Sequence, residues 1–260
     1  MFGFFKKYHK KPRPIYEALG TDIHCHLLPN VDDGSKSAVE SATYLGIMKE
    51  AGFSNIILTP HFQDRNYTNV EEDILNRFET FKKDVEKYPT PNLVGVAGEY
   101  RFDTKFRQRV KDRKFLFIND KFLLFELNMG TEIIGVEEVL FEIQTDDVLR
   151  DKDIILAHPE RYNYYSSHAK TLERLKDMGI YFQVNILSLS GFYGESERKK
   201  GFEMINNGWV EFLGTDLHTN LYSQALIDST YDKDIEKLLN KHTFYNNRVL
   251  DPVFTISNKI

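Results

Sequence analysis

Residues 20–60 read GTDIHCHLLPNVDDGSKSAVESATYLGIMKEAGFSNIILTP and predict a strand–helix–strand unit. The runs LGTDIH at 19–24 and SNIILTP at 54–60 are short and contain β-branched residues, which is typical of strands. Between them Ala38, Ala42 and Leu45 recur about one helical turn apart, and Gly52 follows as a helix cap. A strand, a helix and a second strand in this order predict that the two strands pair in parallel.

The same alternation continues along the chain. Further candidate strands are 92–99, 121–127, 153–159, 180–185 and 209–216, and further candidate helices are 71–88, 135–150, 168–179, 197–208 and 232–242. Seven strands separated by helices predict an α/β domain, and units of about 35 residues favour a closed barrel over an open sheet. We expect one barrel domain at 20–260 and a basic N-terminal extension at 1–19, which either packs on the surface or anchors at a membrane surface.

Composition excludes several classes of protein. The 260 residues include 34 basic and 39 acidic side chains, a formal charge of −5, so the chain lacks the positive field that nonspecific nucleic-acid binding requires. The single cysteine, Cys25, cannot form an internal disulfide, as is usual in a reducing compartment. No apolar run of about 18 residues occurs, and the first residues carry charges where a signal peptide needs an apolar core. We therefore expect a cytoplasmic protein without a transmembrane segment.

Side chains that can bind metals stand at the ends of almost all candidate strands. They are His24 and His26, His61, Glu99, Glu126, His158, and Asp216 with His218. The functional groups of a parallel barrel come from the C-terminal ends of its strands, so these side chains should converge. His24 and His26 should share one face of their strand because side chains alternate with a period of two. A single histidine on a strand is more often a core residue, but the collective pattern favours a metal site.

The donor set indicates which metals fit. Imidazole and carboxylate without thiolate favour zinc, manganese, iron or a related divalent ion over an iron–sulfur cluster or a calcium site. Eight ligands are too many for one ion, so we expect two or three ions, with Glu99 and Asp216 as bridging candidates. Such a cluster lowers the pKa of a bridging water and clamps phosphate oxygens for in-line displacement.

The motifs TDIHCHLLPNVDDGSK, TPHF, GEY, FELNM, AHPERY and GTDLH occur in this order within a resemblance that runs from about residue 20 to 250. Together they resemble the polymerase and histidinol phosphatase (PHP) superfamily, and in particular its CpsB/YwqE-type bacterial manganese-dependent protein-tyrosine phosphatases of capsular and exopolysaccharide synthesis. The resemblance implies a distorted (β/α)7 barrel with a trinuclear site, whose metal is manganese, with iron, zinc or magnesium as alternatives. It also implies a phosphotyrosine protein as substrate, namely the Tyr-rich tail of a bacterial tyrosine kinase.

The resemblance further implies roles for individual residues. The first ion would be held by His24, His26, Glu99 and Asp216, the second by Glu99, Glu126 and His158, and the third by His61, His218 and Asp33. Asp33, in VDDG with its neighbour Asp32, matches an acid implicated in the family's catalysis. Arg161, in HPERY, matches the other implicated group, and its guanidinium would bind two phosphate oxygens.

One family feature is missing. Members of the family carry a further arginine shortly after the DxH motif, whereas no arginine occurs here from Asp216 to Ser223. Arg65, Arg101 and Arg198 are possible replacements, although an arginine such as Arg65 on a charged loop is more often only solvated.

Two alternative functions stay open, and one mechanism is excluded. A cysteinyl-phosphate mechanism needs an arginine six positions after the cysteine, where this chain has Val31 after Cys25. The alternatives are a small-molecule phosphomonoesterase, such as histidinol-phosphate phosphatase, and a non-enzymatic metal-bound module. The aromatic segments RYNYYSS at 161–167 and GFY at 191–193 suit a phenyl ring and a peptide at the mouth of the site, or else anchor loops by packing.

Overall fold

The structure is a computed structural model that describes residues 10–130, 134–164 and 169–254. A strand lies within each of the seven predicted ranges, which confirms the α/β class. These strands are β1 (Thr21–Asp22), β2 (Asn55–Leu58), β4 (Asn92–Val96), β6 (Phe122–Glu126), β7 (Asp153–Ala157), β8 (Tyr181–Asn185) and β9 (Phe212–Gly214). Two short strands, β3 (His61–Phe62) and β5 (Glu99–Arg101), follow β2 and β4 and continue in the same direction.

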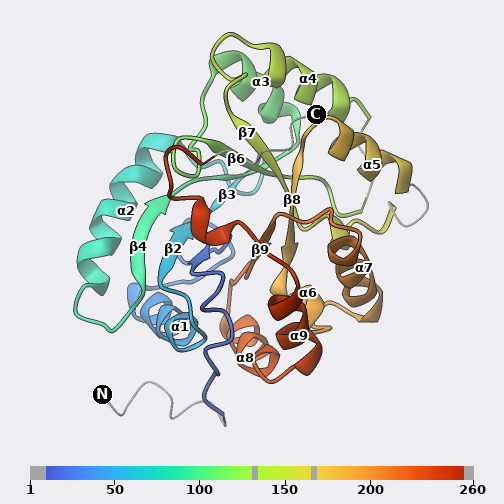
Figure 1. The fold of residues 1–260 in the computed structure, drawn as a ribbon. Helices are drawn as coiled ribbons and strands as arrows, with labels where there is room; N and C mark the ends of the chain where they lie inside the picture. Colours follow the sequence, from blue (N-terminus) through green and yellow to red (C-terminus); the bar gives the residue numbers. More distant parts are fainter. Residues whose placement is uncertain (1–9, 131–133, 165–168, 255–260) are drawn as a thin grey trace.

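The strands form two parallel sheets. The first has the order β1-β2-β4 and the second the order β3-β5-β6-β7-β8-β9. The break falls where β2 passes into β3 at Thr59 and Pro60, because proline has no N–H for a ladder. Beyond β1 and β9, a parallel bridge between Cys25 and Leu217 connects the outer strands of the two sheets. The strands therefore follow one another in a barrel-like order, distorted by the break (Figure 1).

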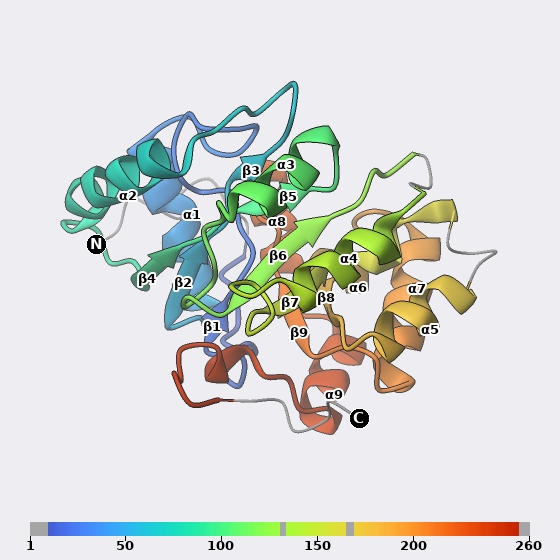
Figure 2. The ribbon, with the colours of Figure 1, turned by 90° about the horizontal axis from the view of Figure 1, so that it is seen from above.

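Helices surround the strands (Figure 2). Six of the helices match predicted ones: α1 (Ala38–Glu50), α2 (Glu71–Val85), α4 (Val136–Thr145), α5 (Ala169–Asp177), α7 (Glu195–Asn206), which begins two residues before its predicted range, and α9 (Lys233–Lys241). The predicted cap of α1 is confirmed: Gly52 has φ +113°, and a Cβ there would lie 2.6 Å from the Glu17 nitrogen. Helix α4 ends before the predicted 150, because Asp146 is extended and its carboxylate accepts the N–H groups of Val148 and Leu149.

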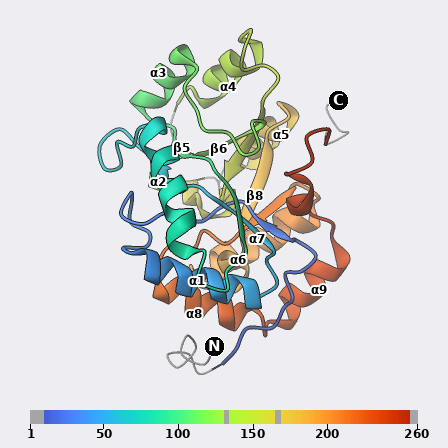
Figure 3. The same cartoon turned by 90° about the vertical axis from the view of Figure 1, so that its left-hand side faces the viewer.

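Three helices go beyond the sequence prediction: α3 (Thr104–Asp112), α6 (Ile186–Leu189) and α8 (Asn220–Ser229). Helix α3 begins at Asp103, whose carboxylate accepts the N–H groups of Lys105 and Phe106. Helix α8 follows the DLH motif and lies beside α1 (Figure 3). The two helices thus pack together although one follows the first strand and the other the last.

Residues 10–19, the described part of the expected extension, pack onto this body. Tyr16 is fully buried, stacks on Phe53 with 5.4 Å between ring centroids, and shares a 2.7 Å hydrogen bond with the Ser229 hydroxyl. Residues 1–9, on which a membrane-surface role depends, lie outside the described residues. Within the described ranges, no helix combines the length and the apolar character that crossing a membrane would require.

An apolar cluster between the strands supports the site. It includes Ile23, Ile57, Ala97, Leu124, Ile155 and Phe212. On β6, Leu124 and Glu126 share a face because they are two residues apart, while Leu123 and Phe125 join the larger core between strands and helices. The same alternation that buries Leu124 therefore places the Glu126 carboxylate beyond it, at the C-terminal end of the strand.

Candidate metal centre

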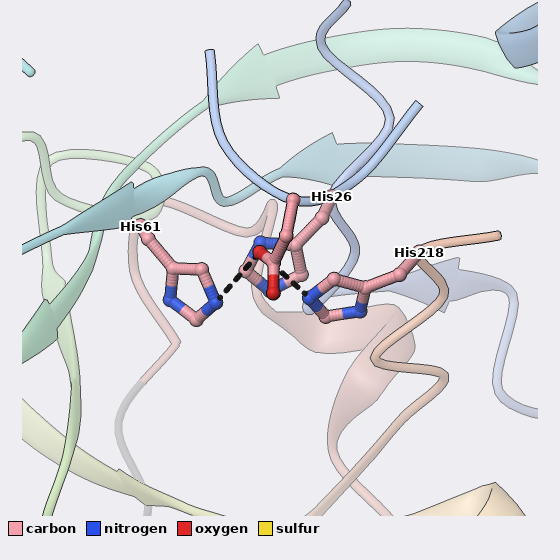
Figure 4. A group of neighbouring side chains, drawn as sticks. His26, His61 and His218 are labelled. Atoms are coloured by element: carbon pink, nitrogen blue, oxygen red, sulfur yellow. Dashed lines mark ion pairs between the residues drawn. The ribbon is translucent and has the colours of Figure 1, made fainter. Parts of the chain in front are cut away.

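All nine residues predicted at the metal site come together at the C-terminal ends of the strands. Four overlapping groups have ligand atoms within 4.8 Å of one another: His26, Asp33, His61 and His218; His24, His26 and Asp216; His24, Glu99 and His158; and His61, Glu99 and Glu126. Figure 4 shows His26, His61 and His218, from three separate segments, converging on one point. Eight of the nine residues are buried, whereas 54% of the Asp33 side chain is exposed. Asp33 therefore marks the side on which the cluster meets solvent.

The HCH segment directs two imidazoles at the same point. The Nε2 atoms of His24 and His26 lie 3.2 Å apart, and each lies within 3.4 Å of a Glu99 oxygen and of Asp216 Oδ1. Cys25 points to the opposite side, where it is fully buried in the core and its Sγ lies 3.7 Å from the Ile57 carbonyl oxygen. Burial raises the pKa of the Cys25 thiol well above its ordinary value. The predicted alternation is confirmed, and the thiol faces away from the cluster.

The remaining ligands group somewhat differently from the sets that the resemblance implied. Glu126 lies with His61, since its Oε1 is 3.5 Å from His61 Nδ1. The Nε2 atom of His158 lies 3.0 Å from Glu99 Oε1 and 3.9 Å from Glu126 Oε2. Asp33 Oδ1 lies 3.4 Å from His61 Nε2 and 3.6 Å from His218 Nε2. The assignment of each ligand to a particular ion stays a prediction.

Two of the histidine rings have a buried hydrogen-bond acceptor at Nδ1, the ring nitrogen that faces away from the cluster. Gln183 Oε1 lies 2.7 Å from His24 Nδ1, and Asp32 Oδ2 lies 2.9 Å from His26 Nδ1. An acceptor at Nδ1 fixes a proton there and leaves the Nε2 lone pair for a cation. Sequence reasoning missed both roles. The signal for Gln183 was an uncharged polar residue inside the otherwise apolar run YFQV, and Asp32 could not be told from its neighbour Asp33.

Replacing Gln183 with leucine is expected to weaken divalent-metal binding by about tenfold to a hundredfold. Leucine fills a similar volume at this fully buried position, but it offers no acceptor to His24 Nδ1. The affinity is measured by titrating metal-free protein with manganese, and Gln108→Leu on the exposed face of α3 is the matched control. Unchanged affinity in a folded Gln183→Leu protein contradicts the positioning role.

Burial and neighbouring charges shift the pKa values of the side chains in the cluster. Burial lowers the pKa of His24, but the carboxylates of Glu99 and Asp216 outweigh it and raise the value to about 9. Burial and the neighbouring charge of Glu99 raise the pKa of Glu126 to about 7. Among the described residues, the buried atoms Glu99 Oε2 and His61 Nδ1 have no hydrogen-bond partner, although they lie only 2.7 Å apart. A cation would satisfy both lone pairs and offset the repulsion between the carboxylates, so this donor set fits divalent metals.

Two of these residues stand on left-handed backbone, which is unusual for residues other than glycine. His158 has φ +37° and Asp216 has φ +51°. Such conformations cost on the order of 1–3 kcal/mol each and persist only where surrounding contacts enforce them. Here the His158 N–H donates to the Gln183 carbonyl and the Asp216 N–H to the His24 carbonyl, both at 2.7 Å. Neighbouring strands therefore hold both side chains at the cluster.

Arg161 lies at the edge of the cluster. Its Nη1 donates to Asp216 Oδ2 at 2.8 Å, and its guanidinium stacks over the Tyr193 ring, 4.1 Å from the centroid. The side chain is 23% exposed. A guanidinium carries five N–H donors, so the pair with Asp216 leaves others for a phosphate group.

Of the three arginines considered as replacements for the missing family residue, Arg101 contacts the cluster. Its Nε donates to Glu126 Oε1 at 3.1 Å, and its Nη2 lies 3.0 Å from the same oxygen as an ion pair. Arg198 instead pairs with Asp232 and Asp234, where α7 meets α9. Arg65 is exposed on the loop that follows β3.

The aromatic segments predicted at the mouth have two different roles. Tyr162 is fully buried, and its hydroxyl donates to the Ala157 carbonyl and accepts the Leu127 N–H, so this residue anchors the loop. Tyr193 lies beside Arg161 at the edge of the cluster, and its hydroxyl lies 3.3 Å from Asp216 Oδ2. Residues 165–167 of the first segment lie outside the described residues.

Comparison with known proteins identifies the family. Residues 20–248 match the sequence model described as Capsular polysaccharide synthesis, CpsB/CapC. CapC of Staphylococcus aureus is 28% identical over 199 residues, and tyrosine-protein phosphatase YwqE of Bacillus subtilis is 26% identical over 198 residues; each alignment covers 76% of both chains. A solved structure, described as YwqE from Bacillus subtilis and CpsB from Streptococcus pneumoniae, unique metal-dependent tyrosine phosphatases, shares the fold. Its TM-score is 0.78 at 23% identity, over 91% of this chain and 96% of that chain. Because the family match spans most of its length, the chain belongs to the CpsB/CapC family of capsular polysaccharide synthesis.

Proposed function

We propose that this chain is a metal-dependent protein-tyrosine phosphatase that acts in capsular or exopolysaccharide synthesis. The observation that carries the proposal is the cluster of four overlapping ligand groups, buried except at Asp33, in a chain of this family. The names of the relatives support it, because YwqE and CpsB are named tyrosine-protein phosphatases.

The ligands of the proposed site are His24, His26, Asp33, His61, Glu99, Glu126, His158, Asp216 and His218. They would hold two or three divalent ions, with manganese as the proposed metal and iron, zinc or magnesium as alternatives. When bound, the ions supply Lewis acidity, which polarises phosphate oxygens and lowers the pKa of water. The chain supplies the rest of the chemistry through the residues around this cluster.

Two residues of the chain would act on the substrate directly. Arg161, held by Asp216 and stacked on Tyr193, would bind phosphate oxygens as their negative charge redistributes. Asp33, exposed between His61 and His218, is placed to exchange a proton with solvent or with the leaving group. Cys25 takes no part in this scheme, because its thiol is buried on the far side of the strand.

The substrate and the cellular setting are part of the same proposal. We take the substrate to be a phosphotyrosine protein, namely the Tyr-rich tail of a bacterial tyrosine kinase, and the location to be the cytoplasm. The exposed position of Asp33 at the edge of the cluster suits a protein substrate, because a phosphotyrosine must reach the ions from a polypeptide outside.

The decisive experiment compares p-nitrophenyl phosphate, a phosphotyrosyl peptide and histidinol phosphate as substrates of one preparation. We expect hydrolysis of the first two, loss of activity after a strong chelator removes the metal, and recovery when manganese is added. Elemental analysis checks that the metal has been removed. Activity that survives complete removal contradicts the mechanism, a preference for histidinol phosphate favours a small-molecule phosphatase, and no hydrolysis of any substrate favours a non-enzymatic module.

A further inference from the structure

A cavity of about 490 Å³ lies at the C-terminal ends of β3, β5 and β6, next to the metal centre. Its lining includes Gln63, Asp64, Arg65, Arg101, Asp103 and Arg107. We propose that this cavity, called here the arginine cavity, binds acidic residues that flank the phosphotyrosine of a polypeptide substrate. The inference rests on the proposed phosphatase function and adds to it a preference for acidic sequence around the phosphorylated residue.

The arginine cavity adjoins the metal cluster, because two of its lining residues contact a member of the cluster. Arg101 donates to Glu126 Oε1, and Gln63 Nε2 donates to the same oxygen at 3.2 Å. Glu126 in turn belongs to the group formed with His61 and Glu99. A polypeptide whose phosphate lies at the cluster therefore has its neighbouring residues within reach of this cavity.

The two acidic residues of the lining are occupied by local contacts. The Asp103 carboxylate accepts three backbone N–H groups, from Asp64, Lys105 and Phe106. Asp64 accepts a hydrogen bond from the Thr104 hydroxyl and lies 4.0 Å from the Lys105 ammonium group. Both carboxylates thus fix the start of α3, and their charges are partly satisfied there.

Two arginines of the lining have no carboxylate partner among the described residues. Arg65 and Arg107 are both exposed, and within the described ranges neither forms an ion pair with a carboxylate. The Arg107 Nη2 has one long contact, 3.4 Å to the Gly135 carbonyl oxygen. Arg101 is different, because Glu126 already offsets its charge.

These features together select the ligand. Cavities of this volume commonly bind small ligands or side-chain groups, and the guanidinium of one arginine can bind a carboxylate through two parallel hydrogen bonds. The chain as a whole carries a net charge of −5, so attraction of an acidic peptide requires a local basic site such as this one. A small substrate such as p-nitrophenyl phosphate has no flanking residues and would leave the cavity empty.

The test uses two phosphotyrosyl peptides that differ only in their flanking residues, Glu and Asp in one and Gln and Asn in the other. We expect the manganese-loaded protein to show a kcat/KM for the acidic peptide about fivefold to tenfold higher, with the difference shrinking as salt is added. In the double variant Arg65→Gln/Arg107→Gln this preference should fall below about twofold, while hydrolysis of p-nitrophenyl phosphate is unchanged. The matched control is Arg77→Gln/Arg150→Gln, which removes two exposed arginines outside the cavity and should keep the preference.

Binding of the unphosphorylated acidic peptide, followed by fluorescence anisotropy, tests the cavity separately from catalysis. Weaker binding to the Arg65→Gln/Arg107→Gln protein than to the control supports the cavity even if no phosphate ester is hydrolysed, and in that case only the phosphatase proposal fails. Equal binding of the acidic peptide to both variants overturns the inference. A preference for acidic peptide that persists in the double variant also overturns it.

Discussion

A Glu99→Gln variant is expected to lose most of its bound divalent metal and at least about a thousandfold of its turnover, which corresponds to about 4 kcal/mol of barrier. Glu99 belongs to two of the four ligand groups, and its oxygens lie close to His24, His26, His61 and His158. Glutamine keeps the shape of the side chain but removes the negative charge that would bridge two cations. Metal content by elemental analysis and turnover of p-nitrophenyl phosphate measure the two effects.

The control for this variant is Glu72→Gln on the exposed face of α2, which removes the same charge away from the site. Circular dichroism establishes that both variants are folded. If Glu99→Gln keeps full metal content and wild-type turnover, the bridging role is wrong and the remaining groups must hold the ions without it.

An Arg161→Lys variant should lower turnover by about tenfold to a hundredfold while the metal content stays unchanged. Lysine keeps a positive charge but loses the planar fork, and with it the simultaneous contacts to Asp216 Oδ2, to the Tyr193 ring and to phosphate. Steady-state kinetics with p-nitrophenyl phosphate and elemental analysis of the same sample separate the loss of catalysis from the loss of metal.

His158→Ala provides the contrast, because it removes a buried member of the cluster and should lower metal content as well as rate. If Arg161→Lys turns over at the wild-type rate while His158→Ala is inactive, the metal site stands and the assignment of the phosphate-binding arginine is wrong. Arg101, which contacts Glu126, would then be the next residue to test.

The strand order and most helices were predictable because apolar periodicity is local. The apolar run DIILA predicts β7 without reference to any other segment, and the helix predicted at 232–242 contains α9. The break between β2 and β3 was not predictable, since it depends on which neighbour each half of the segment pairs with. Helix α3 has a local sequence pattern, namely the Asp103 cap and the buried residues Phe106 and Val110 one turn apart. Its many charged residues make this apolar pattern difficult to recognise.

The residues brought together at the site were predictable for a different reason. A parallel barrel brings all its strand ends to one face, so His61 and Glu99 meet although no local rule relates them. The residues that hydrogen-bond to the ligands were harder to predict. Asp32 and Asp33 are adjacent residues of the same type, and only the backbone conformation directs Asp32 toward His26 and Asp33 toward solvent. The pairing of Arg161 with Asp216 depends on the left-handed backbone of Asp216, and no sequence pattern predicts that conformation.

The hydrogen bond from the Asp216 N–H to the His24 carbonyl has a consequence for how the protein is made. It joins the first strand to the last, and Asp216 and His218 complete two of the four ligand groups. During synthesis the earlier segments emerge first, and contacts between the two ends of a chain form slowly. Ions that bind only the completed cluster favour the closed form by mass action. We therefore expect that, in cells starved of the divalent metal, more newly made chains have an undocked last strand, and that proteases degrade these chains before they turn over any substrate.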